Sequence, residues 1–279
     1  MERAYCCEEN RHEPMIGTAD PVDVWLMLEY TPTWKARAVE ESSLGLAVRG
    51  WLERALATVA ERGRKARPQL IRQPESDSEG VRLLVGLPGA LLQFSGRGYE
   101  FLESIDIGAV LDAPDAHPSV EEPRYFVCTN GQRDLCCARF GLPVYAGLRE
   151  RVGNRAWQVT HLGGHRFAAN VLTLPQGALY GRVGVDDLDG LVESVEADRL
   201  AFRHLRGRVW YKPMVQAAEA LSGRSDLTLV GIDDDDVAAT VRFNGADGEL
   251  AVRVRRGDPV EVIKSCGERA EPVTPFRAG

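Results

Sequence analysis

Apolar and polar positions follow two similar patterns along the chain up to about residue 195. In the first half, a buried-strand run at 24–30 precedes apolar residues at helical spacing over 44–62. The remaining elements predicted for this half are strands at 69–71, 81–87 and 91–94 and a closing helix or mixed segment at 99–110. The pattern predicts a strand–helix–strand unit that continues into a β-hairpin and a final helix.

The second half repeats this order of elements. Its predicted elements are a strand at 125–127, a helical stretch at 136–152 that is broken near Pro143, and a strand at 156–160. The hairpin at 171–179 parallels the hairpin at 83–91 in the first half. We therefore expect two similar units in tandem; chance similarity of two hairpins is the competing interpretation.

Beyond about residue 195 the pattern changes. The predicted elements there are helices at 199–205 and 211–221 and strands at 227–232, 238–243, 250–255 and 260–263. The predicted fold class is α/β (α+β): tandem units with mixed β-sheets flanked by helices, plus a C-terminal α+β appendage. Polar, proline-rich residues at 115–123 form the expected linker, which gives domains at 1–118, 119–198 and 199–279.

Composition and charge narrow the class of protein. A chain of 279 residues can bury one large core or two domains, and 44% hydrophobic with 27% charged residues is ordinary for a soluble globular protein. The formal net charge of −7 argues against a nucleic-acid partner. No run of about 18 apolar residues predicts a membrane span, and residues 1–14 lack the apolar core of a secretory signal. We expect a cytoplasmic protein with neither a membrane nor a nucleic acid as partner.

A pair of cysteines followed by a pair of histidines is the strongest functional signal. Eight residues separate Cys128 from Cys137, and His161 and His165 flank the sequence Leu-Gly-Gly. Two thiolates and two imidazoles suit either tetrahedral zinc or an iron–sulfur cluster. The wide Cys spacing favours a [2Fe–2S] cluster, because zinc knuckles usually separate their thiols by about two to four residues. Packing of both histidines on one helix face is the alternative, which the two glycines between them disfavour.

The other cysteines receive no ligand role. Cys6 and Cys7 lie in a segment expected to be mobile, Cys136 is interpreted as packing beside a ligand, and Cys266 as a lone incidental thiol. A ligand exchange between Cys136 and Cys137, or a disulfide between them, is the alternative. The adjacent pairs do not resemble a secreted disulfide framework, and the absence of CxxC disfavours thiol–disulfide exchange.

The whole Cys–His stretch closely resembles the sucrase/ferredoxin-like family. The resemblance is carried by CTNGQRDLCC at 128–137 and HLGGHRFAANV at 161–171, and it is strong from Arg124 to about Val195. The sequence EPMIGTA at 13–19 is similar to the family's bacterial N-terminal signature.

This resemblance implies a thioredoxin-like ferredoxin domain and a specific set of ligands. The positions that match the family's ligands to [2Fe–2S] are Cys128, Cys137, His161 and His165, with the second Cys pair of all-cysteine ferredoxins replaced by a His pair. We infer two thioredoxin-like units in tandem, of which the first lacks cluster ligands. Nothing in the sequence singles out the paired carboxylates of a glycosidase, so no sucrase activity is assigned.

Together these features predict an electron carrier more than an enzyme. Two neutral imidazoles in place of thiolates stabilise the reduced cluster and raise its potential, as in Rieske centres. A solvent-facing imidazole can couple reduction to protonation, and Arg133 and Arg166 either dock an acidic donor or cover the site. We expect a redox partner protein, such as a reductase or an electron acceptor. The alternative is a thioredoxin-like binding or structural protein with zinc at the four residues.

Overall fold

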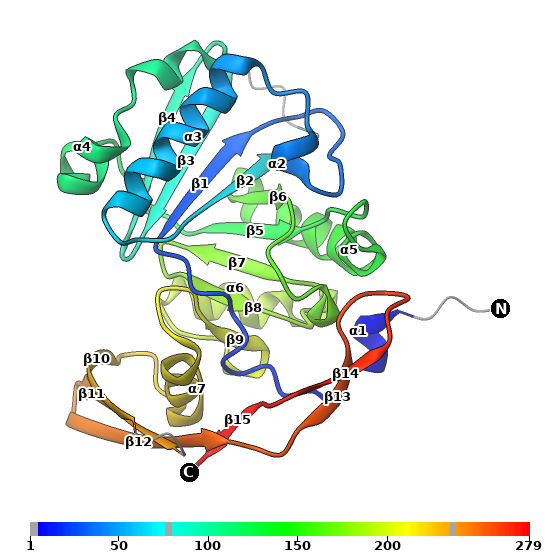
Figure 1. Cartoon of the computed structure of the whole chain (residues 1–279), viewed down its shortest axis with the longest axis vertical. Coiled ribbons are helices and arrows are strands. Elements are labelled where there is room, and N and C mark those ends of the chain that lie inside the picture. The colour runs from blue at the N-terminus through cyan, green and yellow to red at the C-terminus, as the bar shows by residue number, and fades with distance from the viewer. Residues whose placement is uncertain (1–4, 76–79, 235–237) are drawn as a thin grey trace.

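A nine-stranded mixed sheet forms the centre of the computed structural model, which describes residues 5–75, 80–234 and 238–279 (Figure 1). Its strand order is β4-β3-β1-β2-β6-β5-β7-β8-β9. The C-terminal residues add a four-stranded sheet, β10-β11-β12-β15, and the pair β13-β14 within the described part of the chain. The predicted mixed α+β class is thereby confirmed.

The first half contributes four strands of the large sheet. Its elements are β1 (Val24–Glu29), α2 (Ala38–Glu41), α3 (Leu46–Glu61), β2 (Ala66–Arg72), β3 (Val81–Leu87), β4 (Ala90–Gly96), η1 (Tyr99–Ser104), α4 (Ile107–Asp112) and η2 (Pro114–Ala116). β1 pairs with β2 in parallel and with β3 antiparallel. All six residues of β1 are buried, as expected for a strand that is covered on both faces.

The second half has the same order and pairing. Its elements are β5 (Arg124–Cys128), α5 (Leu135–Val152), η3 (Gly153–Arg155), β6 (Ala156–Val159), η4 (His165–Phe167), β7 (Val171–Leu174), β8 (Ala178–Tyr180), η5 (Val185–Asp187) and α6 (Leu188–Glu196). β5 pairs with β6 in parallel and with β7 antiparallel. The halves join where β2 and β6 run antiparallel, with Ile71 opposite Val159.

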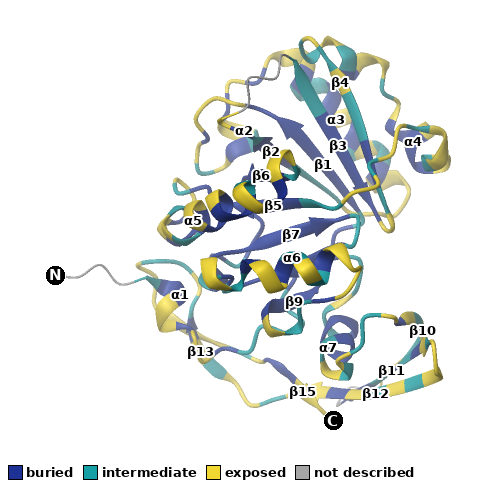
Figure 2. Cartoon of the chain, turned by 180° about the vertical axis from the view of Figure 1, so that it is seen from behind, coloured by how far each residue is buried: buried dark blue, intermediate teal, exposed yellow. Residues whose placement is uncertain are grey.

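The sheet curls so that the two halves share one core. Trp25 and Met27 of β1 pack in the same cluster as Phe126, Cys128 and Trp157 of the second half. The opposite face of β1 packs against α3, and the opposite face of β5 packs against α5 and α6, so the helices lie on the outside (Figures 1 and 2). The end of β5 therefore lies in the protein interior.

The C-terminal residues wrap around the second half. The elements are η6 (Phe202–His204), β9 (Leu205–Arg208), α7 (Pro213–Ser222), β10 (Thr228–Asp234), β11 (Ala238–Gly245), β12 (Gly248–Arg256), β13 (Val260–Ile263), β14 (Ala270–Val273) and β15 (Phe276–Ala278). β9 extends the large sheet beyond β8. β13 and β14 lie beside the short N-terminal helix α1 (Cys6–Glu9), so that part of the C-terminal segment contacts the N-terminal helix (Figure 1).

Three expectations about local structure are wrong. α5 continues through Pro143 without a break. The segment expected to be helical at 199–205 forms a short 3₁₀ turn and leads into β9, because the backbones of Leu205 and Gly207 pair with β8 and the side chain of Arg206 between them is buried. Cys6 and Cys7 are buried in α1, where a mobile tail was expected.

Other expectations are not decided by the fold. The boundaries at residues 118 and 198 stay predictions, although both halves belong to one continuous sheet. Among the described residues, no helix combines the length and the apolar character that crossing a membrane requires.

Candidate metal centre

Three of the four predicted ligands meet at the ends of β5 and β6. Cys128 is the last residue of β5, Cys137 lies in the first turn of α5, and His161 follows β6. One donor atom from each lies within 4.8 Å of the other two, and the Cys137 Sγ is 3.9 Å from the His161 Nδ1. Because β5 and β6 are parallel, they end at the same edge of the sheet, and this brings the two cysteines close to His161. These side chains could hold a metal ion.

His165 lies next to this group without belonging to it. Its ring centroid is 5.1 Å from that of His161. Its Nε2 is 2.9 Å from the Ser265 hydroxyl and 3.5 Å from an oxygen of Asp134. Its Nδ1 is buried and has no hydrogen-bond partner. A buried polar atom without a partner is costly, so this nitrogen is suited to a ligand, and the second nitrogen is held as in metal-bound histidines.

Asp134 positions both ligand pairs. As the N-cap of α5, its side chain accepts a hydrogen bond of 2.8 Å from the Cys136 backbone N–H, which fixes the helix start that carries Cys137. Its other oxygen faces His165. An Asp before an apolar helical segment is a recognisable N-cap signal, so the sequence could have indicated this residue, whereas no sequence signal pointed to Ser265.

The two glycines between the histidines allow a buried arginine to approach the loop. Gly163 and Gly164 both have positive φ, and a Cβ on Gly164 would lie 2.5 Å from the Arg206 Nη2. Arg206 donates hydrogen bonds of 2.8 Å to the Gly163 carbonyl, 2.8 Å to the Asn170 side chain and 2.6 Å to the Thr18 carbonyl. The two glycines therefore lie in a loop that packs closely on Arg206.

The N-terminal signature segment supports the same loop. Glu13 is buried and forms a bidentate ion pair with Arg166, with N–O distances of 2.7 and 2.9 Å. Gly17 donates its backbone N–H to the carbonyl of Arg206, and Thr18 accepts a hydrogen bond from the Arg206 Nε. Arg166 therefore covers the loop and is satisfied within the chain. Of the two arginines considered for docking, only Arg133 is exposed.

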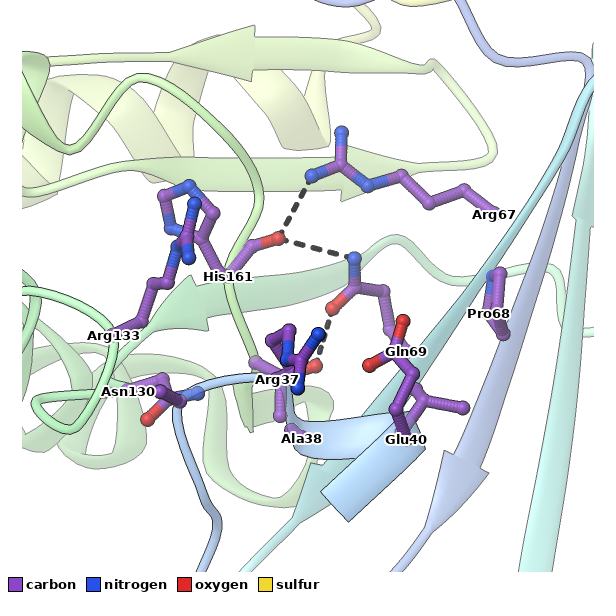
Figure 3. Close-up of a pocket in the computed structure, with 12 residues that line it drawn as sticks. Arg37, Ala38, Glu40, Arg67, Pro68, Gln69, Asn130, Arg133 and His161 are labelled. Atoms are coloured by element: carbon purple, nitrogen blue, oxygen red, sulfur yellow. Dashed lines mark hydrogen bonds between the residues drawn. The ribbon is translucent and has the colours of Figure 1, made fainter. Parts of the chain in front are cut away.

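The first half of the molecule holds the His161 backbone. The Arg67 Nη2 and the Gln69 Nε2, both from β2, donate to the His161 carbonyl at 2.9 and 3.1 Å (Figure 3). The neighbouring Thr160 exchanges hydrogen bonds with the backbone of Leu70. The half without predicted ligands thus fixes the position of one of them.

The electrostatics of the pair of cysteines favour one thiolate. The Cys137 thiol donates to the Cys128 sulfur, and His161 and the Leu162 backbone N–H add further hydrogen bonds, which lower the pKa of Cys128 despite its burial. The same hydrogen bond and burial raise the pKa of Cys137. Burial lowers the pKa of His165, so its imidazole is neutral. A thiolate and a neutral imidazole are the forms that bind metals.

A pocket of about 360 Å³ opens at His161 (Figure 3). His161 is half-buried, whereas Cys128, Cys137 and His165 are buried. The charged residues at the pocket are Arg37, Glu40, Arg67 and Arg133. His161 is therefore the predicted ligand through which the centre reaches the surface, and the surroundings carry more positive than negative side chains.

Comparison with known proteins gives a match to one family. The model of the sucrase/ferredoxin-like family matches residues 15–207, which is more than half of the chain. A protein of Meyerozyma guilliermondii, "Altered inheritance of mitochondria protein 32", is 31% identical over 78 residues, covering 24% of this chain and 28% of its own length. None of the solved structures compared matches the chain. The extent of the family match shows that the chain belongs to the sucrase/ferredoxin-like family.

Proposed function

We propose that the chain binds a [2Fe–2S] cluster through Cys128, Cys137, His161 and His165 and carries single electrons between partner proteins. The observation that carries the proposal is the unpartnered Nδ1 of buried His165, beside a group of two sulfurs and one imidazole. This free nitrogen supports His165 as the fourth donor that the family resemblance implies. Such a cluster supplies a one-electron redox couple.

The surrounding residues suit this role. The Leu162 N–H directed at the Cys128 sulfur favours the reduced state, because hydrogen bonds to the sulfurs raise a cluster's potential. Ser265 and Asp134 hold the outer nitrogen of His165, and burial keeps water away from it. His161 is half-exposed, so its ring can exchange a proton with solvent.

The pocket at His161 is the proposed docking place for a redox partner. Arg37, Arg67 and Arg133 line it together with Glu40. Positive surface at an electron exit attracts an acidic partner and speeds association at low salt. Reversing the charge in Arg133→Glu is expected to slow electron transfer from an acidic donor at low salt without altering the iron content. An unchanged rate at low and high salt would exclude this surface.

A zinc site at the same residues is the second candidate. It is favoured by the three donor atoms that lie within 4.8 Å of one another, which suits a single ion. In that case the protein is a binding or structural protein without redox activity at this centre.

Anaerobic purification under iron-replete conditions separates the two candidates. We expect a red-brown protein with about two irons and two acid-labile sulfides per chain, as a [2Fe–2S] centre requires. His165→Ala should lose the colour, whereas His117→Gln in the first half, which packs on Phe94, should keep it. Colourless protein with zinc lost on mutation of Cys128 or Cys137 would overturn the iron–sulfur proposal.

A further inference from the structure

A second group of metal-ligating side chains lies on the other side of the α5 start. Cys6 from α1, Cys136 from α5 and Cys266 from the segment after β13 bring their sulfurs together, at 3.6 Å, 3.5 Å and 3.4 Å for the three pairs. An oxygen of Asp134 is 3.4 Å from the Cys266 sulfur. One donor atom of each of the four residues lies within 4.8 Å of all the others. None of the four is a predicted ligand of the first centre.

The distances fit a shared ion better than a covalent bond. Two sulfurs on one tetrahedral zinc with Zn–S bonds of about 2.3 Å are roughly 3.8 Å apart, whereas a disulfide needs about 2.05 Å. All three sulfur pairs lie between 3.4 and 3.6 Å. A disulfide would join only two of the three sulfurs, but one ion can bind all of them together with the carboxylate.

The way the group is built argues against ordinary apolar packing. Its members come from segments 130 and 260 residues apart in sequence, and α1 has only four residues. Short segments that bury little apolar surface commonly need a metal or a disulfide to stay in place. The Cys6 backbone N–H points to the Cys266 sulfur at 3.5 Å, and Asp134 accepts hydrogen bonds from the backbones of Cys136 and Cys266. Such contacts support thiolates and fix the ligand spacing.

We propose that Cys6, Cys136, Cys266 and Asp134 bind a structural zinc ion, separate from the centre at Cys128 and His165. Zinc fits because the donors are three sulfurs and one oxygen, mostly buried, in a closed group of four. Binding releases the thiol protons to solvent and involves no electron transfer. The proposal does not depend on which metal the first centre holds.

The ion would hold α1 and the segment after β13 against the start of α5, next to the first centre. Ser265, next to Cys266, is hydrogen-bonded to the His165 Nε2 at 2.9 Å, and Asp134 also faces that nitrogen. A ligand set that ties Cys266 to α5 therefore fixes the hydroxyl that orients His165. The second site is a positioning device for the first, in addition to its effect on stability.

Metal analysis of matched cysteine variants tests the proposal. We expect about one zinc per chain in the wild type. The zinc content should fall by at least about fivefold in Cys6→Ser and Cys266→Ser, because four ligands hold structural zinc far more tightly than three. Cys128→Ser should keep the zinc. The control is Cys7→Ser, which removes a buried thiol of the same helix outside the donor group and should keep the zinc. Iron should fall most in Cys128→Ser and by a smaller factor in Cys6→Ser and Cys266→Ser, because these two changes loosen Ser265 beside His165 but leave the proposed iron ligands in place.

The same samples distinguish the failure of each proposal. Two zincs per chain, one lost in Cys266→Ser and one in Cys128→Ser, would support the second site and overturn the iron–sulfur cluster. Zinc lost in Cys128→Ser alone would overturn both. Zinc-free wild type with a mapped disulfide among Cys6, Cys136 and Cys266 would overturn the second site and replace it by a redox-active pair.

X-ray absorption at the zinc edge of the wild type serves if the variants fail to fold. About three sulfurs at roughly 2.3 Å and one oxygen at roughly 2.0–2.2 Å are expected for the proposed donor set. Two sulfurs and two nitrogens would assign the zinc to the first centre, and an absent zinc signal would exclude the second site.

Discussion

The two halves of the large sheet share one strand arrangement, yet among the residues that the structure describes only the second half brings candidate metal-ligating side chains together at its strand ends. β1 ends at Glu29, where β5 ends at Cys128. The Glu29 carboxylate is buried against Arg82, which donates to it from its Nε at 2.9 Å and from its backbone N–H at 3.1 Å. At Cys128 the neighbours are a second thiol and an imidazole. The same backbone position thus forms an ion pair in one half and carries a candidate metal ligand in the other.

The loop after the central strand differs in the same sense. In the first half, residues 30–45 separate β1 from α3, whereas only residues 129–134 separate β5 from α5. The short loop places the N-terminus of an 18-residue helix at the strand end, where its dipole favours thiolates. After β2, Gln73 donates to two backbone carbonyls of the second half, while the segment after β6 carries His161. In the first half these polar groups stabilise the fold, whereas the matching positions of the second half carry the candidate metal ligands.

The largest difference between the halves should come from substituting the last residue of each central strand. Cys128→Ser is expected to lower iron binding by at least about tenfold, because even outer partners of a metal site contribute about 10–100-fold. Glu29→Gln should keep the iron and lower the free energy of unfolding by about 1–3 kcal/mol, because Arg82 loses its ionic partner. Iron assays and urea unfolding measure the two effects. Loss of iron in Glu29→Gln would mean that the first half takes part in binding.

Neighbouring cysteines of α5 should behave differently. Cys137→Ser is expected to remove the cluster, whereas Cys136→Ser should keep its visible absorbance, because the Cys136 sulfur faces Cys6 and Cys266. Absorbance spectra and iron content of the two variants check this expectation. The reverse result, with iron lost in Cys136→Ser and kept in Cys137→Ser, would show that Cys136 is the ligand and Cys137 is not.

Replacing an imidazole by a thiolate should move the reduction potential. His161→Cys or His165→Cys is expected to lower it by roughly 100–300 mV, about half of the difference between two-histidine and all-cysteine centres. The added negative charge disfavours the reduced state. Redox titration of the visible spectrum measures the shift, with His117→Gln as the control. An unchanged potential in both variants would remove these histidines from the ligand set.

The pH dependence of the potential should distinguish the two histidines. An imidazole on the oxidised centre loses its remaining ring proton more readily than on the reduced centre. Between those two pKa values reduction takes up a proton, so the potential falls by about 59 mV per pH unit, and it is flat on either side. His161 is half-exposed and His165 is sealed, so one proton is expected. The slope should disappear in His161→Cys and persist in His165→Cys; a flat wild-type profile would contradict proton coupling.

The smallest effect concerns the contact between the halves. Gln69→Leu removes one of the two donors to the His161 carbonyl and should lower the free energy of unfolding by about 1 kcal/mol. It should also shift the reduction potential, because the loop that carries His161 loses one of the hydrogen bonds that fix its position. Gln73→Leu, which cuts bonds to Asn154 and Ala156 instead, is the matched control and should lower stability alone. Equal potentials in the two variants would mean that β2 supports the fold and not the ligand.

Much of the fold could be predicted because runs of apolar residues determine where its buried strands and helices lie. The strand expected at 24–30 is Val24–Glu29, and the helix expected at 44–62 is Leu46–Glu61. β9 was missed because its buried Arg206 and its glycine do not follow a hydrophobic alternation. The break expected at Pro143 did not occur. The 18-residue helix α5 continues although proline lacks the backbone N–H that would donate to the preceding turn.

The candidate site was predictable only where its residues are close in sequence. Cys128, Cys137 and His161, which the sequence singled out, lie close together in the structure, whereas their role as ligands stays a prediction. The group of Cys6, Cys136 and Cys266 was not foreseen, because its members were judged one at a time and their contacts span up to 260 residues. The supports Arg206 and Ser265 depend on tertiary contacts that no local pattern encodes.

The hydrogen bond between Ser265 and His165 has a consequence for biosynthesis. The two residues are 100 positions apart in the chain. At a translation rate of roughly 5–20 residues per second, His165 leaves the ribosome's active centre roughly 5–20 s before Ser265 is made. During that interval the imidazole lacks the hydroxyl that orients it, and Thr18 waits in the same way for Arg206. If the proposed centre binds its metal, we therefore expect stable loading only after synthesis of the C-terminal segment, when Ser265 can reach His165.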